Sequence, residues 1–118
     1  MTAQAEIVMP EETGIVFIYV TAPSAEVAEH IAAAAVEEKL AACANILPGM
    51  TSVYRWQGKV ERASEVVVIL KTRADVSATL MQRIKTLHPY EVPCAVSLPV
   101  LGGLDDYLGW IKAETLAE

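Results

Sequence analysis

The stretch from Ala44 to Thr72 restricts the possible folds of this chain more than any other part. It reads as two strands joined by a tight turn at Gln57-Gly58-Lys59. The second strand ends in the run Val66–Leu70, and a β-branched run that is apolar on both faces is typical of the middle of a covered sheet. Each arm spans about 12 to 14 residues, whereas an ordinary strand has about five or six. The pattern therefore predicts a hairpin that is longer than the sheet to which it belongs.

A buried strand and an amphipathic helix are expected before the hairpin. An unbroken apolar run predicts the strand over residues 14–21. Ser24 is a favourable N-cap for the helix, which is expected to extend to about Ala42. Its apolar stripe consists of Val27, Ala28, Ile31, Ala32, Ala35 and Val36. Because most of these residues are alanine, the helix can lie close against a sheet.

Proline residues mark the next boundaries. Pro48-Gly49 predicts a bulge and an edge position for the first arm of the hairpin, because proline cannot donate a ladder hydrogen bond. A second helix is expected to be capped by Asp75 and to stop near His88, because Pro89 disfavours helical geometry in the residue before it. Its apolar face is predicted to contain Val76, Leu80, Ile84 and Leu87.

Two shorter elements are expected at the C-terminal end. Residues 92–100 are a strand candidate, and Pro93 and Pro99 again favour an edge position. A closing helix is predicted over residues 104–117. Its packing face is expected to contain Tyr107, Leu108, Trp110 and Ile111.

This order of elements predicts an α+β fold of the ferredoxin-like βαββαβ type, with a terminal helix added. A single domain is expected over residues 14–118, after a flexible segment over residues 1–13. The first strand has only about eight residues, so half of the hairpin would extend beyond the sheet. Proteins usually cover such exposed β-surface, and a closed ring of sister copies would do so. We therefore expect an oligomer.

The composition excludes some classes of partner. The 118 residues are 53% hydrophobic and carry a formal net charge of −6, which argues against nucleic acid or an anionic membrane as the main partner. The hairpin is nevertheless locally basic: five of the nine basic residues lie on or beside it, namely Arg55, Lys59, Arg62, Lys71 and Arg73. Two interpretations stay open, a solvated face or a cleft that tolerates an anion.

The cysteines and the N-terminal composition bear on the compartment. The chain has two cysteines, Cys43 and Cys94, and no C-x-x-C motif, so reduced thiols are the default. The first dozen residues lack the basic start and apolar run of a secretory signal. A cytoplasmic location is therefore expected.

Several motifs, taken together, resemble the CutA family of divalent-cation tolerance proteins, over about residues 14–115. These motifs are Ala41-Ala42-Cys43-Ala44-Asn45-Ile46, Tyr54-Arg55-Trp56-Gln57-Gly58-Lys59-Val60-Glu61, Leu70-Lys71-Thr72, His88-Pro89-Tyr90-Glu91-Val92-Pro93 and Tyr107-Leu108-Gly109-Trp110-Ile111. The resemblance implies a ferredoxin-like fold, a tight homotrimer built from extended hairpins, and a link to copper (Cu²⁺) and other divalent cations. The family is also similar in architecture to PII signalling trimers, which bind small ligands between subunits. Cys94 is not required by the family pattern and receives no family role.

Cys43, His88 and Glu91 are the candidate metal ligands. Cys43 is interpreted either as a buried small hydrophobic residue or as a soft ligand for copper. His88 either interacts with the end of its helix or joins Cys43 or Glu91 as a ligand. His30 is expected to be a surface residue, because it falls on the polar stripe of the first helix.

A second set of residues is expected at an interface or a ligand cleft. Packing between subunits, rather than catalysis, is the preferred interpretation for Tyr54, Trp56 and Trp110. Two roles stay open for Asn45, Glu61 and Lys71, either a cleft between subunits or a buried polar seam. Tyr90, from the His-Pro-Tyr motif, is placed with this set.

No catalytic motif is present in the sequence. It has no nucleophile elbow, no H-E-x-x-H sequence and no glycine-rich phosphate loop, so the protein is not expected to be an enzyme. Two hypotheses of different class follow. The first is a homotrimer that binds divalent metal and contributes to copper tolerance. The second is a PII-like trimeric sensor or scaffold that holds an anionic small molecule or nucleotide near Lys71, Arg73 and Glu91, with incidental metal binding.

Overall fold

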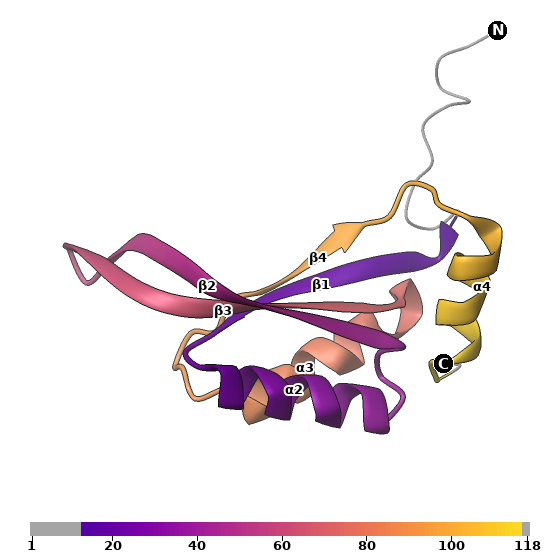
Figure 1. Cartoon of the computed structure of the whole chain (residues 1–118), viewed down its shortest axis with the longest axis horizontal. Coiled ribbons are helices and arrows are strands. Elements are labelled where there is room, and N and C mark those ends of the chain that lie inside the picture. Colours follow the sequence, from indigo (N-terminus) through magenta and orange to yellow (C-terminus); the bar gives the residue numbers. More distant parts are fainter. Residues whose placement is uncertain (1–12, 117–118) are drawn as a thin grey trace, which may run out of the picture.

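A four-stranded antiparallel sheet carries two helices on one face and a third helix at one end (Figure 1). The computed structural model describes residues 13–116. Its elements, in chain order, are β1 (Ile15–Ala22), α2 (Ala25–Glu37), β2 (Cys43–Trp56), β3 (Lys59–Arg73), the 3-10 helix η2 (Ala74–Val76), α3 (Ser77–Leu87), β4 (Ala95–Pro99) and α4 (Asp105–Ala113). The strand order β2-β3-β1-β4 confirms the predicted α+β, ferredoxin-like sandwich, with β1 and β3 as the central pair.

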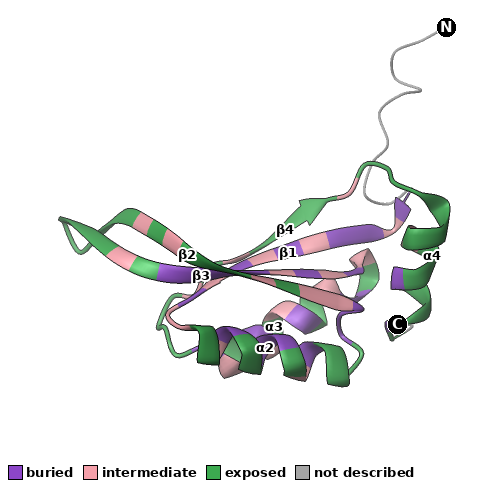
Figure 2. Cartoon of the chain, viewed as in Figure 1, coloured by how far each residue is buried: buried purple, intermediate pink, exposed green. Residues whose placement is uncertain are grey.

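The hairpin formed by β2 and β3 extends well beyond the other strands. β3 pairs with β2 out to Trp56↔Lys59, but with β1 only as far as Ala22↔Val66. Residues 50–56 and 59–65, here called the overhang, therefore pair only with each other within the described chain, as the sequence predicted. Gln57 (φ 52°) and Gly58 (φ 81°) both adopt the left-handed conformation of a tight two-residue turn. In Figure 2 the outer part of the overhang is almost entirely exposed.

A bulge bends the hairpin where the overhang begins. The register passes from Leu47↔Val67 to Met50↔Glu65, so three steps on β2 oppose two steps on β3. The bulge contains Pro48-Gly49, as predicted, and Gly49 has a φ of 82°, which other residues rarely adopt.

The main core lies between the sheet and helices α2 and α3. Alternate residues of β1 and β3 face the helices. The core residues of the sheet and of the helices are almost fully buried; in the sheet they are Ile18, Val20, Val68 and Leu70, and in the helices Ile31, Leu80 and Ile84. A smaller cluster of Ile15, Ala42 and Ile111 anchors α4 to the start of β1. Burial of this apolar surface is the main force that holds the layers together.

Helix α2 begins as predicted but ends early. Ser24 Oγ accepts a hydrogen bond from the Val27 N–H at 3.2 Å, which confirms the N-cap. The expectation that the helix extends to about Ala42 is wrong, because Lys39 adopts a left-handed φ of 62° and reverses the chain. Ala42 already donates to the Lys71 carbonyl, as a residue entering the sheet. Val36, predicted to lie on the buried stripe, is 40% exposed in the last turn.

Helix α3 has a different start from the one expected. Asp75 does not cap it but lies in η2, where it accepts two hydrogen bonds from the Arg73 guanidinium, each 3.0 Å long. That guanidinium holds the pKa of Asp75 below its usual value. The helix ends at Leu87, as Pro89 predicted, and the His88 N–H donates to the Ile84 carbonyl.

The C-terminal elements are shorter than predicted. Strand β4 covers Ala95–Pro99 rather than residues 92–100, although the Val100 N–H still donates to the Ile15 carbonyl of β1, and its edge position is confirmed. Helix α4 stops at Ala113. Ile111 is buried and Leu108 partly so, but Tyr107 and Trp110 are 39% and 43% exposed, because α4 meets the sheet through one narrow stripe.

The predicted flexible segment, residues 1–13, lies outside the described residues except for Thr13. Thr13 is buried, and its hydroxyl donates to the Val100 carbonyl at 2.7 Å. Within residues 13–116, no helix is long and apolar enough to cross a membrane.

Candidate functional site

Two of the predicted metal ligands, Cys43 and His88, lie near opposite ends of β1. Cys43, half-buried at the start of β2, pairs with Lys71, which in turn pairs with Phe17 of β1. His88 instead contacts Thr21, four residues further along β1 and thus about 13 Å away at 3.3 Å per residue. Between residues 13 and 116, no group of three or more His, Cys, Asp or Glu side chains is arranged to hold a metal ion. A single chain therefore does not bring Cys43 and His88 together.

His88 has hydrogen-bond partners at both ring nitrogens. It is only 7% exposed; its Nδ1 accepts the Tyr90 backbone N–H at 3.1 Å, and its Nε2 lies 2.7 Å from the Thr21 carbonyl oxygen. Because Nδ1 accepts, the proton is on Nε2 and is donated to Thr21. The side chain thus ties the loop after α3 to β1, rather than contacting the last carbonyls of its own helix. A metal ion would have to replace one of these two bonds.

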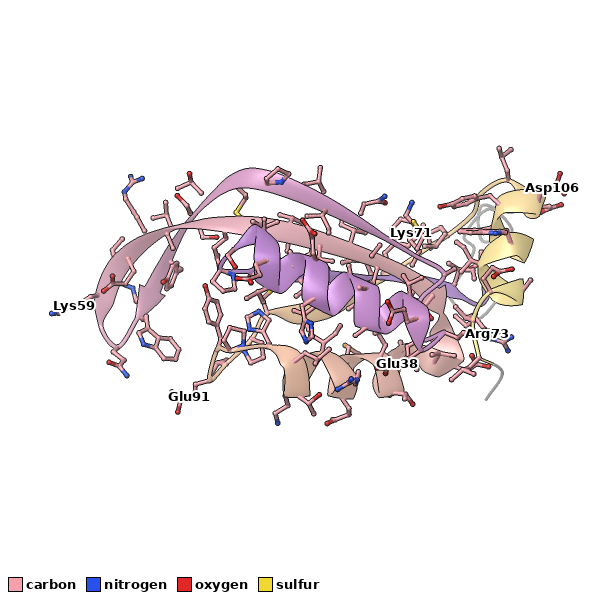
Figure 3. The ribbon with its side chains drawn as sticks, turned by 60° about the horizontal axis from the view of Figure 1, so that its bottom comes forward. Glu38, Lys59, Lys71, Arg73, Glu91 and Asp106 are labelled. Atoms are coloured by element: carbon pink, nitrogen blue, oxygen red, sulfur yellow. The ribbon has the colours of Figure 1, made fainter. Side chains whose placement is uncertain are left out.

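Glu91 lies in the same loop but is exposed to solvent. In Figure 3 it is near neither Lys71 nor Arg73, which lie toward the α4 end of the sheet. One chain consequently does not bring together Lys71, Arg73 and Glu91, the residues near which the second hypothesis placed an anionic ligand.

A buried carboxylate, Glu65, lies at the base of the overhang and was not among the predicted site residues. Glu65 is 7% exposed and accepts hydrogen bonds from the hydroxyls of Ser52 (2.5 Å) and Tyr90 (2.9 Å). Each of its two oxygens thus has one partner, and no ion pair involves Glu65 among the described residues. Its position directly before the buried run Val66–Leu70 was the available signal, since a charged residue there is adjacent to covered strand.

The hydroxyl of Tyr90 is perturbed by this environment. Burial raises the pKa of Tyr90 to about 12, and the hydrogen bond to the Glu65 carboxylate adds to the effect, followed by the charges of Glu65 and Tyr54. The residue as a whole is 38% exposed, although its hydroxyl donates to the buried Glu65 carboxylate. The Tyr90 and His88 rings are also in contact, with centroids 4.7 Å apart.

Lys71 lies at the other end of the sheet, among aromatic side chains. Its Nζ is 3.0 Å from the Tyr107 hydroxyl and 5.3 Å from the centroids of both the Phe17 and Tyr107 rings. The Tyr107 ring stacks on the Trp110 ring, with the ring centroids 5.8 Å apart. This cluster combines a cation with an exposed aromatic surface. Tyr107 and Phe17 were not predicted as part of it.

The remaining predicted interface residues are distributed along the hairpin. Asn45 is exposed two residues after Cys43, whereas Glu61 and Tyr54 face each other as a pair on the overhang. Glu61 is therefore separated from Asn45 and Lys71, and the three residues form no buried seam within one chain. Tyr54 and Trp56 are 44% and 43% exposed. Both rings therefore keep a large exposed surface in the single chain.

Comparison with known proteins identifies what the chain resembles. The family model described as CutA1 divalent ion tolerance protein matches residues 16–114. The divalent-cation tolerance protein CutA of Thermus thermophilus is 49% identical over 98 residues, covering 83% of this chain and 95% of that protein. The chloroplastic protein CutA of Arabidopsis thaliana is 45% identical over 100 residues, covering 85% of this chain but only 55% of that longer protein.

Solved structures agree with the sequence matches. The structure titled periplasmic divalent cation tolerance protein CutA from Archaeoglobus fulgidus superimposes with a TM-score of 0.83 at 44% identity. The superposition covers 85% of this chain and 97% of that one. The similarity therefore extends over most of this chain and nearly all of the solved structure.

Proposed function

Because this chain belongs to the CutA1 family of divalent ion tolerance proteins, we propose that it binds divalent cations, copper foremost, and contributes to metal tolerance as a homotrimer. The observation that carries the proposal is the family match over residues 16–114, which includes every helix and strand from β1 to α4 except Ile15, the first residue of β1. The hairpin geometry independently supports association of copies, whereas the number of three comes from the family resemblance.

We propose that Cys43, His88 and Glu91 supply metal ligands, and that a complete site uses more than one subunit. Thiolate suits Cu(I), and imidazole suits Cu(II) or zinc. The separation of Cys43 from His88 within a chain favours ligands from neighbouring copies. Cys43 is half-exposed and Glu91 is exposed, so both are accessible in a single chain. His88 can take part only if its bond to the Tyr90 N–H or to the Thr21 carbonyl is exchanged for metal.

The overhang supports assembly into a closed ring. It presents two strands of backbone beyond the end of β1, together with exposed Val53, Tyr54, Trp56 and Val60. Proteins normally cover such edges and apolar side chains. Heterologous contacts of one hairpin with the next subunit form a ring when the rotation closes. A trimer is the ring that the family resemblance implies.

A PII-like sensor is the second candidate, and the Lys71 cluster favours it. Lys71 provides a cation, and the exposed Tyr107–Trp110 pair beside it provides a surface on which a base can stack. An anionic ligand held between subunits would meet both groups. Under this alternative, metal binding is incidental.

We further propose that the protein is cytoplasmic and not an enzyme. Cys43 and Cys94 are both free thiols, as expected in a reducing compartment. The relatives named chloroplastic and periplasmic belong to other compartments, so location is tested separately by fractionation of the native host. The absence of catalytic motifs from the sequence and the family's name as a tolerance protein support a binding role.

Calorimetry on the metal-free protein with Cu(II), Zn(II) and a panel of nucleotides separates the two candidates. Saturable copper binding that is lost in Cys43→Ser or Glu91→Gln, and retained in the controls Cys94→Ser and His30→Ala, supports the first. A saturable nucleotide isotherm without a metal response supports the second. If the protein binds neither metal nor nucleotide, both proposals are refuted and a purely structural role is left.

A further inference from the structure

The direction of the overhang is not determined by the sheet. Beyond the pair Ala22↔Val66, β3 pairs with no strand other than β2 among residues 13–116, and the bulge at Pro48-Gly49 bends β2 at the same level. A free two-stranded ribbon is at best marginally stable and twists readily. Some other contact must hold the overhang at a defined angle to the sheet.

The hydroxyl of Tyr90 makes that contact. It donates to Glu65 Oε2, and Ser52 of the opposite strand donates to Glu65 Oε1. Glu65 lies at the first position of the overhang, where Met50 pairs with it. Of the side-chain hydrogen bonds that the described residues form, this one alone joins the overhang to another element.

Tyr90 is itself held from the central strand. Its backbone N–H donates to His88 Nδ1, and His88 Nε2–H donates to the Thr21 carbonyl of β1. Pro89 lies between the two residues and fixes its own φ. Thr21 pairs with Val67, two residues from Glu65. The contacts therefore form a closed circuit. Strand β3 pairs with β1, β1 bonds the loop after α3 through His88, and that loop bonds β3 again through Tyr90.

We propose that Tyr90 and Glu65 form a clamp that positions the overhang, and thereby sets the surface that the hairpin offers to a second copy of the chain. The carboxylate is buried, so losing the Tyr90 hydroxyl leaves one of its oxygens without a partner. The Tyr90 hydroxyl faces Glu65 and Tyr54 from the hairpin, and the His88 ring contacts the Tyr90 ring. Only the last step of this inference, the surface for a second copy, rests on the proposed trimer.

The test uses amide hydrogen exchange on the intact chain with Tyr90→Phe, which removes one hydroxyl and keeps the ring. Amides of the overhang should exchange about tenfold faster, while those of residues 66–70 keep the rate of the parent. Tyr107→Phe is the matched control, because it loses the tyrosine hydroxyl bonded to Lys71 at the other end of the sheet. Glu65→Gln, which keeps a carbonyl acceptor for Tyr90, should exchange more slowly in the overhang than Glu65→Ala.

Two results would overturn the clamp: unchanged exchange in the overhang of Tyr90→Phe, or equal acceleration throughout β3. Light scattering on the same samples should show weaker assembly for Tyr90→Phe than for Tyr107→Phe. If the parent itself has the mass of one chain, the trimer proposal fails, while the exchange data still decide whether the clamp exists.

Discussion

The hydroxyl of Thr72 donates a 2.7 Å hydrogen bond to the backbone carbonyl of Leu40, and Thr72 is fully buried. The bond ties the reversal after α2 to the end of β3. Thr72→Val removes the donor and keeps the shape, so the Leu40 carbonyl loses a buried partner. We expect the free energy of unfolding to fall by about 1–3 kcal/mol, measured by chemical denaturation. Thr72→Ser keeps the hydroxyl and should lose less; a valine variant as stable as the parent would contradict the importance of this bond.

Truncation of the core face of α2 should be much more costly than truncation of its exposed edge. Ile31 is fully buried against the sheet, whereas Val36 is 40% exposed five residues later. Ile31→Ala should lower the free energy of unfolding by about 2–5 kcal/mol through lost burial and a cavity. Val36→Ala should change it by about 0.5 kcal/mol or less. Thermal denaturation of the two variants side by side checks the difference, and equal effects would refute the assigned helix face.

Alkaline pH should lower the free energy of unfolding through the ionisation of Tyr90. Its pKa is about 12 in the folded state against 10.0 ordinarily, so the folded state favours the protonated phenol. This contribution to stability is complete below about pH 10 and is lost as the pH rises toward about 12, because the unfolded chain releases the proton first. Denaturation at about pH 9 and about pH 11 should show a larger loss for the parent than for Tyr90→Phe. An identical loss in both proteins would mean that other groups account for the alkaline effect.

Removal of Trp56 should affect assembly more than the folding of the single chain. The side chain is 43% exposed on the overhang, so its truncation removes little burial within one subunit. At a subunit interface the same side chain would be a large anchor, on the order of 3 kcal/mol if fully buried. Light scattering across a dilution series should show Trp56→Ala dissociating at higher concentration than the control Val36→Ala. Assembly and melting identical to the parent would show that Trp56 is not an anchor.

The sheet was predictable because its signals are strong and local. A β-branched run apolar on both faces predicts a central strand, and Val66–Leu70 of β3 is one. Pro48-Gly49 indicated the bulge, since only certain backbone conformations suit those two residues. The helix boundaries were harder. Nothing local indicated that Lys39 would take a left-handed conformation, which only the return of the chain into the sheet requires.

The candidate site was less predictable, because it depends on distances between elements. Cys43 and His88 are equally plausible ligands by residue type, but the register of β1 separates them along the sheet. Glu65 was not singled out from the sequence, because its bonds come from Ser52 across the hairpin and from Tyr90 in a distant loop. The burial of Glu65 depends on this tertiary contact, and the pattern of apolar and polar residues along the strand does not indicate such a contact.

The lengths of chain between paired strands have a consequence for how the protein folds. β2 and β3 are adjacent in sequence, so their pairing closes only a two-residue turn, whereas Ile15↔Arg73 and Val16↔Pro99 must close loops many times longer. Closing short loops costs less entropy and is faster, so the hairpin should form before β1 and β4 dock. During that interval a folding chain would expose an apolar hairpin whose backbone hydrogen-bonding edges are unpaired. Newly made copies would then associate wrongly, and refolding at high protein concentration should yield more aggregate than refolding at low concentration.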